Sequence, residues 1–382
     1  MTPRIPLSAP DITQAEVDAV TRVLQTPFLS LGPELQLFED ALAAYHHVPH
    51  AVAVSSGTAG LHLALMTLKI GSGDEVIVPS FTFIAVANAV LQVGATPVLV
   101  DIDPVTMNMQ PAAVEEAITP HTRAMIVVHT FGVPAEMDDL TFIARRHKLL
   151  MIEDACEALG AAYGSGTAAK RVGRFGDLAV FGFYPNKQIT TGEGGAVLAS
   201  NPSHALRLQS LRNQGRRPDA GWLDHAETGF NYRLPEMACA LGRVQLSRIE
   251  RILACRQSVA KRYHELLGEI EGLELPALEL PQRTISWFVF VVRLPQRANR
   301  ERVQDALAAH GIATGRYFAP VHLQPSWKSR QQDASRPLPV TESIARRSLA
   351  LPFFNRLQPE QQQAVADALR EVLSSAGSPP VA

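Results

Sequence analysis

The sequence predicts an α/β protein: a large domain with a mostly parallel seven-stranded sheet flanked by helices, followed by a smaller α+β C-terminal domain. Two observations lead to this prediction. Short β-branched runs alternate with longer stretches of helical periodicity, which is typical of parallel strands joined by covering helices. The chain also has 382 residues, more than one hydrophobic core usually holds. We therefore expect one domain at residues 1–250, including the N-terminal segment, and another at 251–382.

Seven apolar runs are the expected strands of the large sheet. They lie at residues 51–54, 75–78, 96–100, 124–128, 149–153, 178–181 and 195–199. Between these runs, apolar side chains recur every three or four residues, which is the period of a helix with one buried face. This spacing predicts helices at residues 57–68, 85–93, 111–118 and 137–147.

Beyond residue 233 the pattern of alternating strands and helices ends, and the smaller domain is expected to begin near residue 250. A long helical stretch covers residues 234–267, and a loop with three prolines covers residues 273–281. The prediction continues with a strand at 286–294, a helix at 300–310 that ends before Gly311, and a closing helix at 358–374. Residues after 377 are expected to form a frayed tail.

Composition and charge exclude several classes of protein. Hydrophobic residues make up 46% and charged residues 19%, close to the average for soluble globular proteins. The formal net charge is -2 without long runs of one sign, so we expect no nucleic-acid partner. No apolar run approaches the roughly 20 residues that span a bilayer, so we expect no membrane partner.

The three cysteines and the N-terminus indicate a cellular compartment. Cys156, Cys239 and Cys255 have no CxxC spacing, which argues against both a disulfide framework and a structural zinc site. The first ten residues contain three prolines and lack the apolar segment of a signal peptide. We therefore expect a cytoplasmic protein without a metal site.

The segment from Ser55 to Gly60 could bind an anion. It follows a predicted strand and opens a predicted helix, so unpaired backbone N–H groups at the helix N-terminus could face a phosphate. Ser and Thr are also ordinary helix caps, and that interpretation remains open here.

Glu153 and Asp154 end a predicted strand at the edge where open α/β sheets bind their ligands. One of them could cap the following helix instead. A carboxylate is also what pyridoxal phosphate (PLP) requires beside its pyridine nitrogen, because a protonated ring accepts electrons. Asp154 is our candidate for that role.

Lys187 lies between two predicted strands, beside a turn that contains Gly192, Gly194 and Gly195. Lysines are usually solvated surface charges. A lysine withdrawn from water, however, is suited to Schiff-base formation and proton transfer. The aromatic and glycine-rich surroundings favour this second interpretation.

Together these segments resemble the DegT-type sugar aminotransferases, a family of PLP enzymes of fold type I. The resemblance covers nearly the whole chain and implies the PLP transferase fold for the large domain. It rests on ordered motifs at residues 31–33, 56–59, 61–65, 73–83, 100–104, 153–155, 183–187, 192–195, 229–234 and 319–324.

The resemblance implies the following roles around the cofactor. Lys187 is the Schiff-base lysine, and Asp154 pairs with the pyridine nitrogen. Ser56, Gly57 and Thr58 hold the phosphate.

Further roles follow from the same resemblance. Phe83 matches the aromatic residue that stacks on the ring, although a Phe in an apolar stretch is by default a core residue. Asn231 matches a residue that reaches the cofactor phosphate of the neighbouring subunit, which implies a homodimer. By itself Asn231 would pass for a turn residue. Candidate substrate contacts are Tyr184, Arg233, Tyr317 and His322.

Two positions depart from the commoner family pattern. Gly182 stands where many members carry a phosphate-binding serine, and Glu157 stands where many carry a glutamine near the cofactor. We include both residues in the cofactor site. Some members are dehydratases with histidine at the lysine position, and Lys187 argues against that branch.

The function implied by the resemblance is transamination, with L-glutamate as donor and pyridoxamine phosphate (PMP) as the intermediate form of the cofactor. The expected acceptor is a keto sugar, a nucleotide-linked 4-keto-6-deoxyhexose, because residues 186–195 are similar to the perosamine-synthase-like part of the family. One alternative is a non-nucleotide ring ketone, such as a keto-cyclitol or an aminobenzoate precursor. Another is a regulatory protein that binds PLP without turnover.

Overall fold

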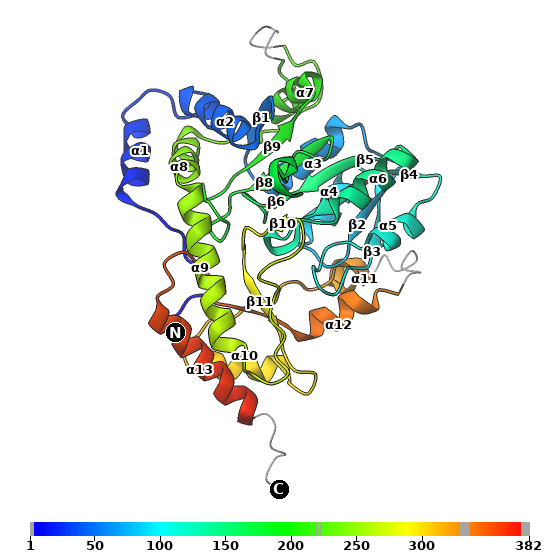
Figure 1. The fold of residues 1–382 in the computed structure, drawn as a ribbon. Helices are drawn as coiled ribbons and strands as arrows, with labels where there is room; N and C mark the ends of the chain where they lie inside the picture. The colour runs from blue at the N-terminus through cyan, green and yellow to red at the C-terminus, as the bar shows by residue number, and fades with distance from the viewer. Residues whose placement is uncertain (1–3, 218–220, 222–223, 329–336, 376–382) are drawn as a thin grey trace.

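The computed structural model describes residues 4–217, 221, 224–328 and 337–375 (Figure 1). The tail predicted after residue 377 lies outside these residues. The chain has the predicted fold class, with a mostly parallel seven-stranded sheet between layers of helices. None of the described helices is both long and apolar enough to cross a membrane.

The large sheet is built from the seven predicted segments, whose ends agree with the prediction within two residues. In spatial order the strands are β1 (His50–Val54), β9 (Gly195–Ala199), β8 (Leu178–Gly182), β5 (Leu150–Asp154), β4 (Thr122–Val128), β2 (Glu75–Pro79) and β3 (Thr96–Val100). Strand β9 pairs antiparallel with both β1 and β8, and the other neighbouring strands pair parallel. Six strands therefore end at the same edge.

Helices cover both faces of this sheet because successive strand side chains point to opposite faces. Val52 and Val54 pack under α3 (Gly57–Thr67), α4 (Ala85–Gln92) and α7 (Pro202–Arg212). Ala51 and Ala53 face the other way, toward α2 (Pro33–His46) and α8 (Glu236–Ser247). Farther along that second face lie α5 (Pro111–Ala117) and α6 (Met137–His147). Burial on both faces explains why the strands read as continuous apolar runs.

A second core lies beside the sheet domain. It contains β11 (Phe290–Arg293) paired antiparallel with β12 (Ser348–Leu351), covered by α9 (Ile249–Leu267), α10 (Arg300–Ala309) and α13 (Pro359–Ser375). Ile5 near the N-terminus also packs in this core. Helix α9 contributes Ile252 to the sheet core and Tyr263 to the second core. The domain division near residue 250 stays a prediction.

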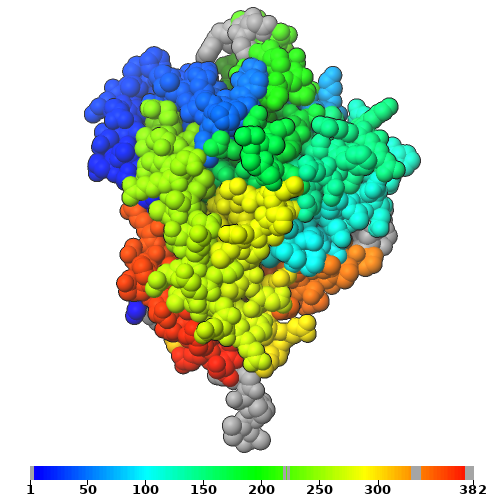
Figure 2. Space-filling view, in the orientation of Figure 1, coloured from blue at the N-terminus to red at the C-terminus, as the bar shows by residue number. Residues whose placement is uncertain are grey.

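The predicted helix at 234–267 is wrong in one respect, because it is divided into α8 and α9 at Arg248. The backbone of Arg248 has φ -105° and ψ 6°, outside helical geometry, and its guanidinium pairs with Asp11 and Glu16. Helix α1 (Gln14–Leu24) thereby packs against α8, and Figure 2 shows this N-terminal segment in blue against the yellow-green helix. The predicted strand at 286–294 is also shorter, because Trp287 has φ 52°.

The remaining described elements are short or had no sequence prediction. They are β6 (Ala162–Tyr163), β7 (Lys170–Arg171), β10 (Arg283–Thr284), α11 (Pro325–Lys328), α12 (Pro339–Arg347) and the 3-10 turns η1 (Thr130–Gly132), η2 (Gly166–Ala168) and η3 (Val321–Leu323).

Candidate active site

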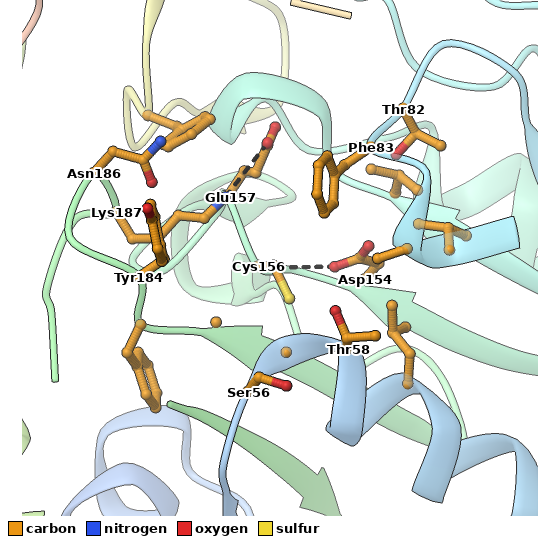
Figure 3. A pocket seen from close by; sticks show the side chains of 18 of the residues that line it. Ser56, Thr58, Thr82, Phe83, Asp154, Cys156, Glu157, Tyr184, Asn186 and Lys187 are labelled. Atoms are coloured by element: carbon orange, nitrogen blue, oxygen red, sulfur yellow. Dashed lines mark hydrogen bonds and ion pairs between the residues drawn. The ribbon is translucent and has the colours of Figure 1, made fainter. Parts of the chain in front are cut away.

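Four connecting segments meet at one edge of the large sheet. Residues 55–58 follow β1, residues 80–84 follow β2, Asp154 ends β5, and Lys187 lies in the connection from β8 to β9. Open α/β sheets bind ligands at this carboxyl edge. Here the four segments line one cavity of about 500 Å³, and Figure 3 shows their side chains around it.

The first wall of the cavity is the N-terminus of α3. The Ser56 hydroxyl accepts a hydrogen bond from the Ala59 N–H at 3.0 Å, so Ser56 is the helix cap. Ser56, Gly57 and Thr58 also line the cavity. The first N–H groups of a helix lack partners within it, and the helix dipole favours negative charge there. Capping and anion binding are therefore compatible at this segment.

Cys156 fills the space between two glycines of the cavity wall. A Cβ atom on Gly57 would lie 2.7 Å from the Cys156 sulfur, and one on Gly182 would lie 3.2 Å from it. Glycine at both positions lets the α3 N-terminus and the end of β8 approach this side chain. Cys156 thus occupies the space that a side chain at position 182, such as the serine of many family members, would enter.

Asp154 forms the second wall. Its residue surface is only 7% exposed, and its Oδ1 atom accepts a hydrogen bond from the Cys156 N–H at 3.1 Å. Burial is the main reason that the pKa of the Cys156 thiol lies well above its usual value, and the charge of Asp154 raises it further. Cys156 is therefore a neutral thiol in this wall.

Lys187 forms the third wall together with Glu157. The lysine side chain is 15% exposed; its Nζ atom lies 3.5 Å from Oε1 of Glu157 and 3.9 Å from the centre of the Phe288 ring. Arg256, itself buried, donates hydrogen bonds to the main-chain carbonyls of Lys187 and Phe288 at 3.1 Å each. Both the backbone and the side chain of Lys187 are thus held by the protein, so it is not a solvated surface charge.

Aromatic residues complete the cavity. Phe83 is 60% exposed although it is hydrophobic, so it is not the core residue that an apolar stretch would suggest. Tyr317 accepts a hydrogen bond from the Asn186 side-chain amide at 3.3 Å, and burial, with a smaller contribution from Glu157, raises the pKa of the Tyr317 phenol. An exposed ring beside a carboxylate and a lysine suits a flat aromatic ligand.

Most of the residues predicted for the site lie in this cavity. They are Ser56, Gly57, Thr58, Phe83, Asp154, Glu157, Gly182, Tyr184, Lys187 and Tyr317.

Three predicted residues do not line the cavity. Asn231 is exposed, and Arg233 donates a hydrogen bond to the side chain of Asn213 at 3.0 Å. The Nδ1 atom of His322 lies 2.7 Å from the Ser80 hydroxyl. Their predicted roles at the cofactor or the substrate stay predictions.

Sequence reasoning missed seven other residues that line the cavity with polar, sulfur or aromatic groups. They are Thr82, Cys156, Phe183, Asn186, Glu193, Phe288 and Phe318. Five of them lie within two residues of a predicted site residue, so sequence proximity could have found them. Phe288 is about a hundred positions from Lys187, and only the tertiary structure brings these two residues together.

The cavity provides the groups that PLP binding requires. An anion site at a helix N-terminus suits the phosphate, the carboxylate of Asp154 suits the pyridine nitrogen, and Lys187 can form the Schiff base. A methyl group on Gly57 would collide with the Cys156 sulfur. The absence of a side chain at Gly57 therefore allows the backbone of the anion site to pack closely against this wall of the cavity. Fold and site together define a PLP-dependent aminotransferase.

The chain belongs to the DegT/DnrJ/EryC1/StrS aminotransferase family, whose pattern its residues 10–370 match. It is 40% identical over 375 residues to GDP-perosamine synthase of Caulobacter vibrioides, covering 97% of this chain and 99% of the relative. It is 41% identical over 377 residues to dTDP-3-amino-3,4,6-trideoxy-alpha-D-glucose transaminase of Streptomyces venezuelae, covering 97% and 96%.

A solved structure is similar over the same length. The crystal structure of DesV from S. venezuelae in complex with a ketimine intermediate superposes with a TM-score of 0.88 at 40% identity, covering 99% of this chain and 100% of that one. The family and the enzyme class predicted from the sequence are thereby confirmed. The cofactor is confirmed as well, because the PMP form of the Streptococcus pneumoniae protein Spr1654 superposes with a TM-score of 0.92 at 27% identity, covering 98% of this chain and 100% of that one.

Proposed function

We propose that this enzyme transfers an amino group from L-glutamate to a nucleotide-linked 4-keto-6-deoxyhexose, yielding an amino sugar for polysaccharide, glycan or natural-product assembly. The observation that carries the proposal is the single cavity in which Lys187, Asp154 and the N-terminus of α3 meet. Two relatives of similar length and about 40% identity bear names of enzymes that make nucleotide-linked amino sugars, which supports the nucleotide-linked acceptor.

Each wall of the cavity has a proposed task. Residues 56–58 bind the phosphate, Asp154 keeps a proton on the pyridine nitrogen, and Phe83 stacks on the ring. Bound PLP supplies an electron-accepting ring next to the carbon that loses its proton. Lys187 takes that proton from the Cα atom of the donor and returns it in the opposite half-reaction.

The acceptor and the assembly are further parts of the proposal. Tyr184 and Tyr317 line the cavity and are proposed to contact the sugar, and Arg233 and His322 are proposed to approach it when substrate is bound. Asn231, which is exposed in this chain, is proposed to reach the cofactor phosphate of a second copy in a homodimer.

The proposed location is the cytoplasm. The three cysteines are free thiols in the structure, as expected of a protein in a reducing compartment. We also propose the domain division near residue 250.

Two alternatives remain distinguishable by experiment. A keto-cyclitol or an aminobenzoate precursor would use the same half-reaction with glutamate but a different acceptor. A regulatory protein would bind PLP without turnover, and the presence of both Lys187 and Asp154 in the cavity argues against it.

The test begins with the near-ultraviolet and visible absorbance of the purified protein, before and after L-glutamate is added. We expect the visible absorbance of lysine-bound PLP in the wild type, its loss on addition of glutamate, and no such band in Lys187→Ala. The glutamate-treated protein is then mixed with GDP- and dTDP-linked 4-keto-6-deoxyhexoses, and with a keto-cyclitol as control. Recovery of the band with the keto-cyclitol alone would contradict the proposed acceptor. A PLP band that glutamate leaves unchanged would favour the regulatory alternative.

A further inference from the structure

Glu157 is a buried carboxyl group in the wall of the cavity. It lies three residues after Asp154, in the turn that follows β5, and its residue surface is 7% exposed. An ionisable side chain is costly to bury unless it has partners that satisfy it. The partners of Glu157 therefore indicate what the residue does.

Two hydrogen bonds fix Glu157 in place. Its Oε2 atom accepts from the Phe131 N–H at 2.9 Å, and its main-chain carbonyl accepts from the side-chain amide of Gln188 at 2.5 Å. Phe131 lies in the 3-10 turn η1, which follows β4, and its φ is 57°. Its N–H group therefore comes from a different segment than β5 and the turn after β5. Oε2 is occupied in this way, and the other oxygen, Oε1, lies 3.5 Å from Nζ of Lys187. Figure 3 marks this contact with a dashed line between the two side chains.

A glutamine could not replace these contacts. Its single oxygen would be required by the Phe131 N–H, so its NH2 group would face the ammonium group of Lys187. Both groups are donors, and neither could accept. A carboxylate can accept from both partners at once. The residue type at position 157 thus decides whether Lys187 has an acceptor on this side.

Other charged and titratable groups surround the pair. Asp154 ends β5 and Cys156 lies in the turn after it, and the charge of Glu157 also acts on the phenol of Tyr317. Burial raises the pKa of the Glu157 carboxyl, and the charge of Asp154 adds to this effect. The positive charge of Lys187 is the largest influence in the opposite direction, since it favours the ionised carboxylate.

We propose that Glu157 is a positioning residue whose carboxylate binds the ammonium group of Lys187 whenever this lysine is not bound to the cofactor. The Phe288 ring, 3.9 Å from Nζ, covers another side of the same ammonium group. By stabilising the protonated lysine, Glu157 makes the free amine a stronger base for the proton transfer. The inference rests on the proposed role of Lys187 but on no particular sugar.

The test measures the proton on Lys187 directly. The protein is loaded with PMP, which leaves Lys187 free, and is treated with acetic anhydride at a series of pH values. The chain has six lysines, so peptide mass spectrometry can follow the acetylation of each one separately. Only the unprotonated amine reacts, and the midpoint of the pH profile therefore reports when Lys187 loses its proton.

We expect Glu157→Gln to move the Lys187 midpoint to lower pH by about one to three pH units, the usual effect of an adjacent opposite charge. Glu157→Asp, which keeps the charge, should move it by less than half as much. Glu193→Gln removes a carboxylate from the same cavity and should leave the midpoint in place. Lys69 and Lys261, both exposed, serve as references for the reagent and the pH within each sample, and retention of PMP shows that the variant is folded.

Two results would overturn the inference. One is a Lys187 midpoint in Glu157→Gln equal to that of the wild type. The other is an equal shift in Glu157→Gln and Glu157→Asp, which would make packing rather than charge the cause. Failure to retain PMP would instead count against the cofactor site, so the two failures are distinguishable.

Discussion

The packing of Cys156 against Gly182 predicts how this chain would respond to the serine that many family members carry. A Cβ atom at position 182 would lie 3.2 Å from the sulfur and 3.3 Å from the Cβ atom of Cys156. Both distances are shorter than ordinary carbon contacts, and overpacking of this kind costs about 1–3 kcal/mol. Gly182→Ser should therefore destabilise the protein, and removing the sulfur with Cys156→Ala should make room for the serine.

The magnitude can be stated as a melting temperature. An entropy of unfolding of about 2 cal/mol/K per residue gives about 0.8 kcal/mol/K for a chain of this length. Gly182→Ser should then melt about 1–4 °C below the wild type. The double variant Cys156→Ala/Gly182→Ser should melt higher than the sum of the two single effects predicts, with a coupling energy of about 1 kcal/mol or more.

The assay is a double-mutant cycle by thermal unfolding of the cofactor-free protein, at one pH and one scan rate. Omitting PLP keeps changes in cofactor affinity out of the result. Cys156→Ala with the natural Gly182 supplies the control for loss of the sulfur alone. If the two substitutions are additive within about 0.5 kcal/mol, the two side chains do not compete for space and the reasoning fails.

Three further predictions follow from buried groups. Asp154→Asn should still bind PLP, measured by absorbance, but lose turnover by about 10²-fold or more, as when a preorganised electrostatic partner is removed; full activity would refute its proposed role. Arg212→Met should lower stability by about 3–5 kcal/mol, because it leaves the buried Glu39 carboxylate without its ion pair, and Glu39→Leu in the same chain should restore much of the melting temperature. Burial lowers the pKa of His46 from 6.5 to about 3, so the unfolded chain binds a proton in that range that the folded chain does not, and stability falls as the pH falls below 6.5. His46→Gln should therefore lose less melting temperature than the wild type between about pH 7 and pH 4; parallel curves would contradict this.

Local sequence was sufficient for the sheet and for part of the site. The strands are buried on both faces, so each appears as a short apolar run between turn residues, and all seven could be located within two residues. Asp154 and residues 56–58 could be assigned to one site because they follow such strands, and parallel strands end at a common edge. Lys187 needed the additional information of the family motif, because a lysine between two strands is usually solvent-exposed.

Contacts between distant segments decided the rest. The break between α8 and α9 at Arg248 could not be read from helical periodicity, because it depends on ion pairs with Asp11 and Glu16 in the N-terminal segment. Helix α1 was missed although its signals are local, since Thr13 and Glu16 form a capping box at its start; only its position against α8 depends on the tertiary structure.

The chain's own sequence thus determined the fold class, the cofactor and the edge of the sheet at which the cofactor site lies. These properties depend on residue types and periodicities that are local in the chain. The tertiary structure alone decided that Cys156 fills the space beside Gly182, that Phe288 covers Lys187, and that one oxygen of Glu157 is left for the lysine. Such contacts arise when the second core packs against the sheet and when separate loops meet at its edge, and no periodicity in the sequence records those distances.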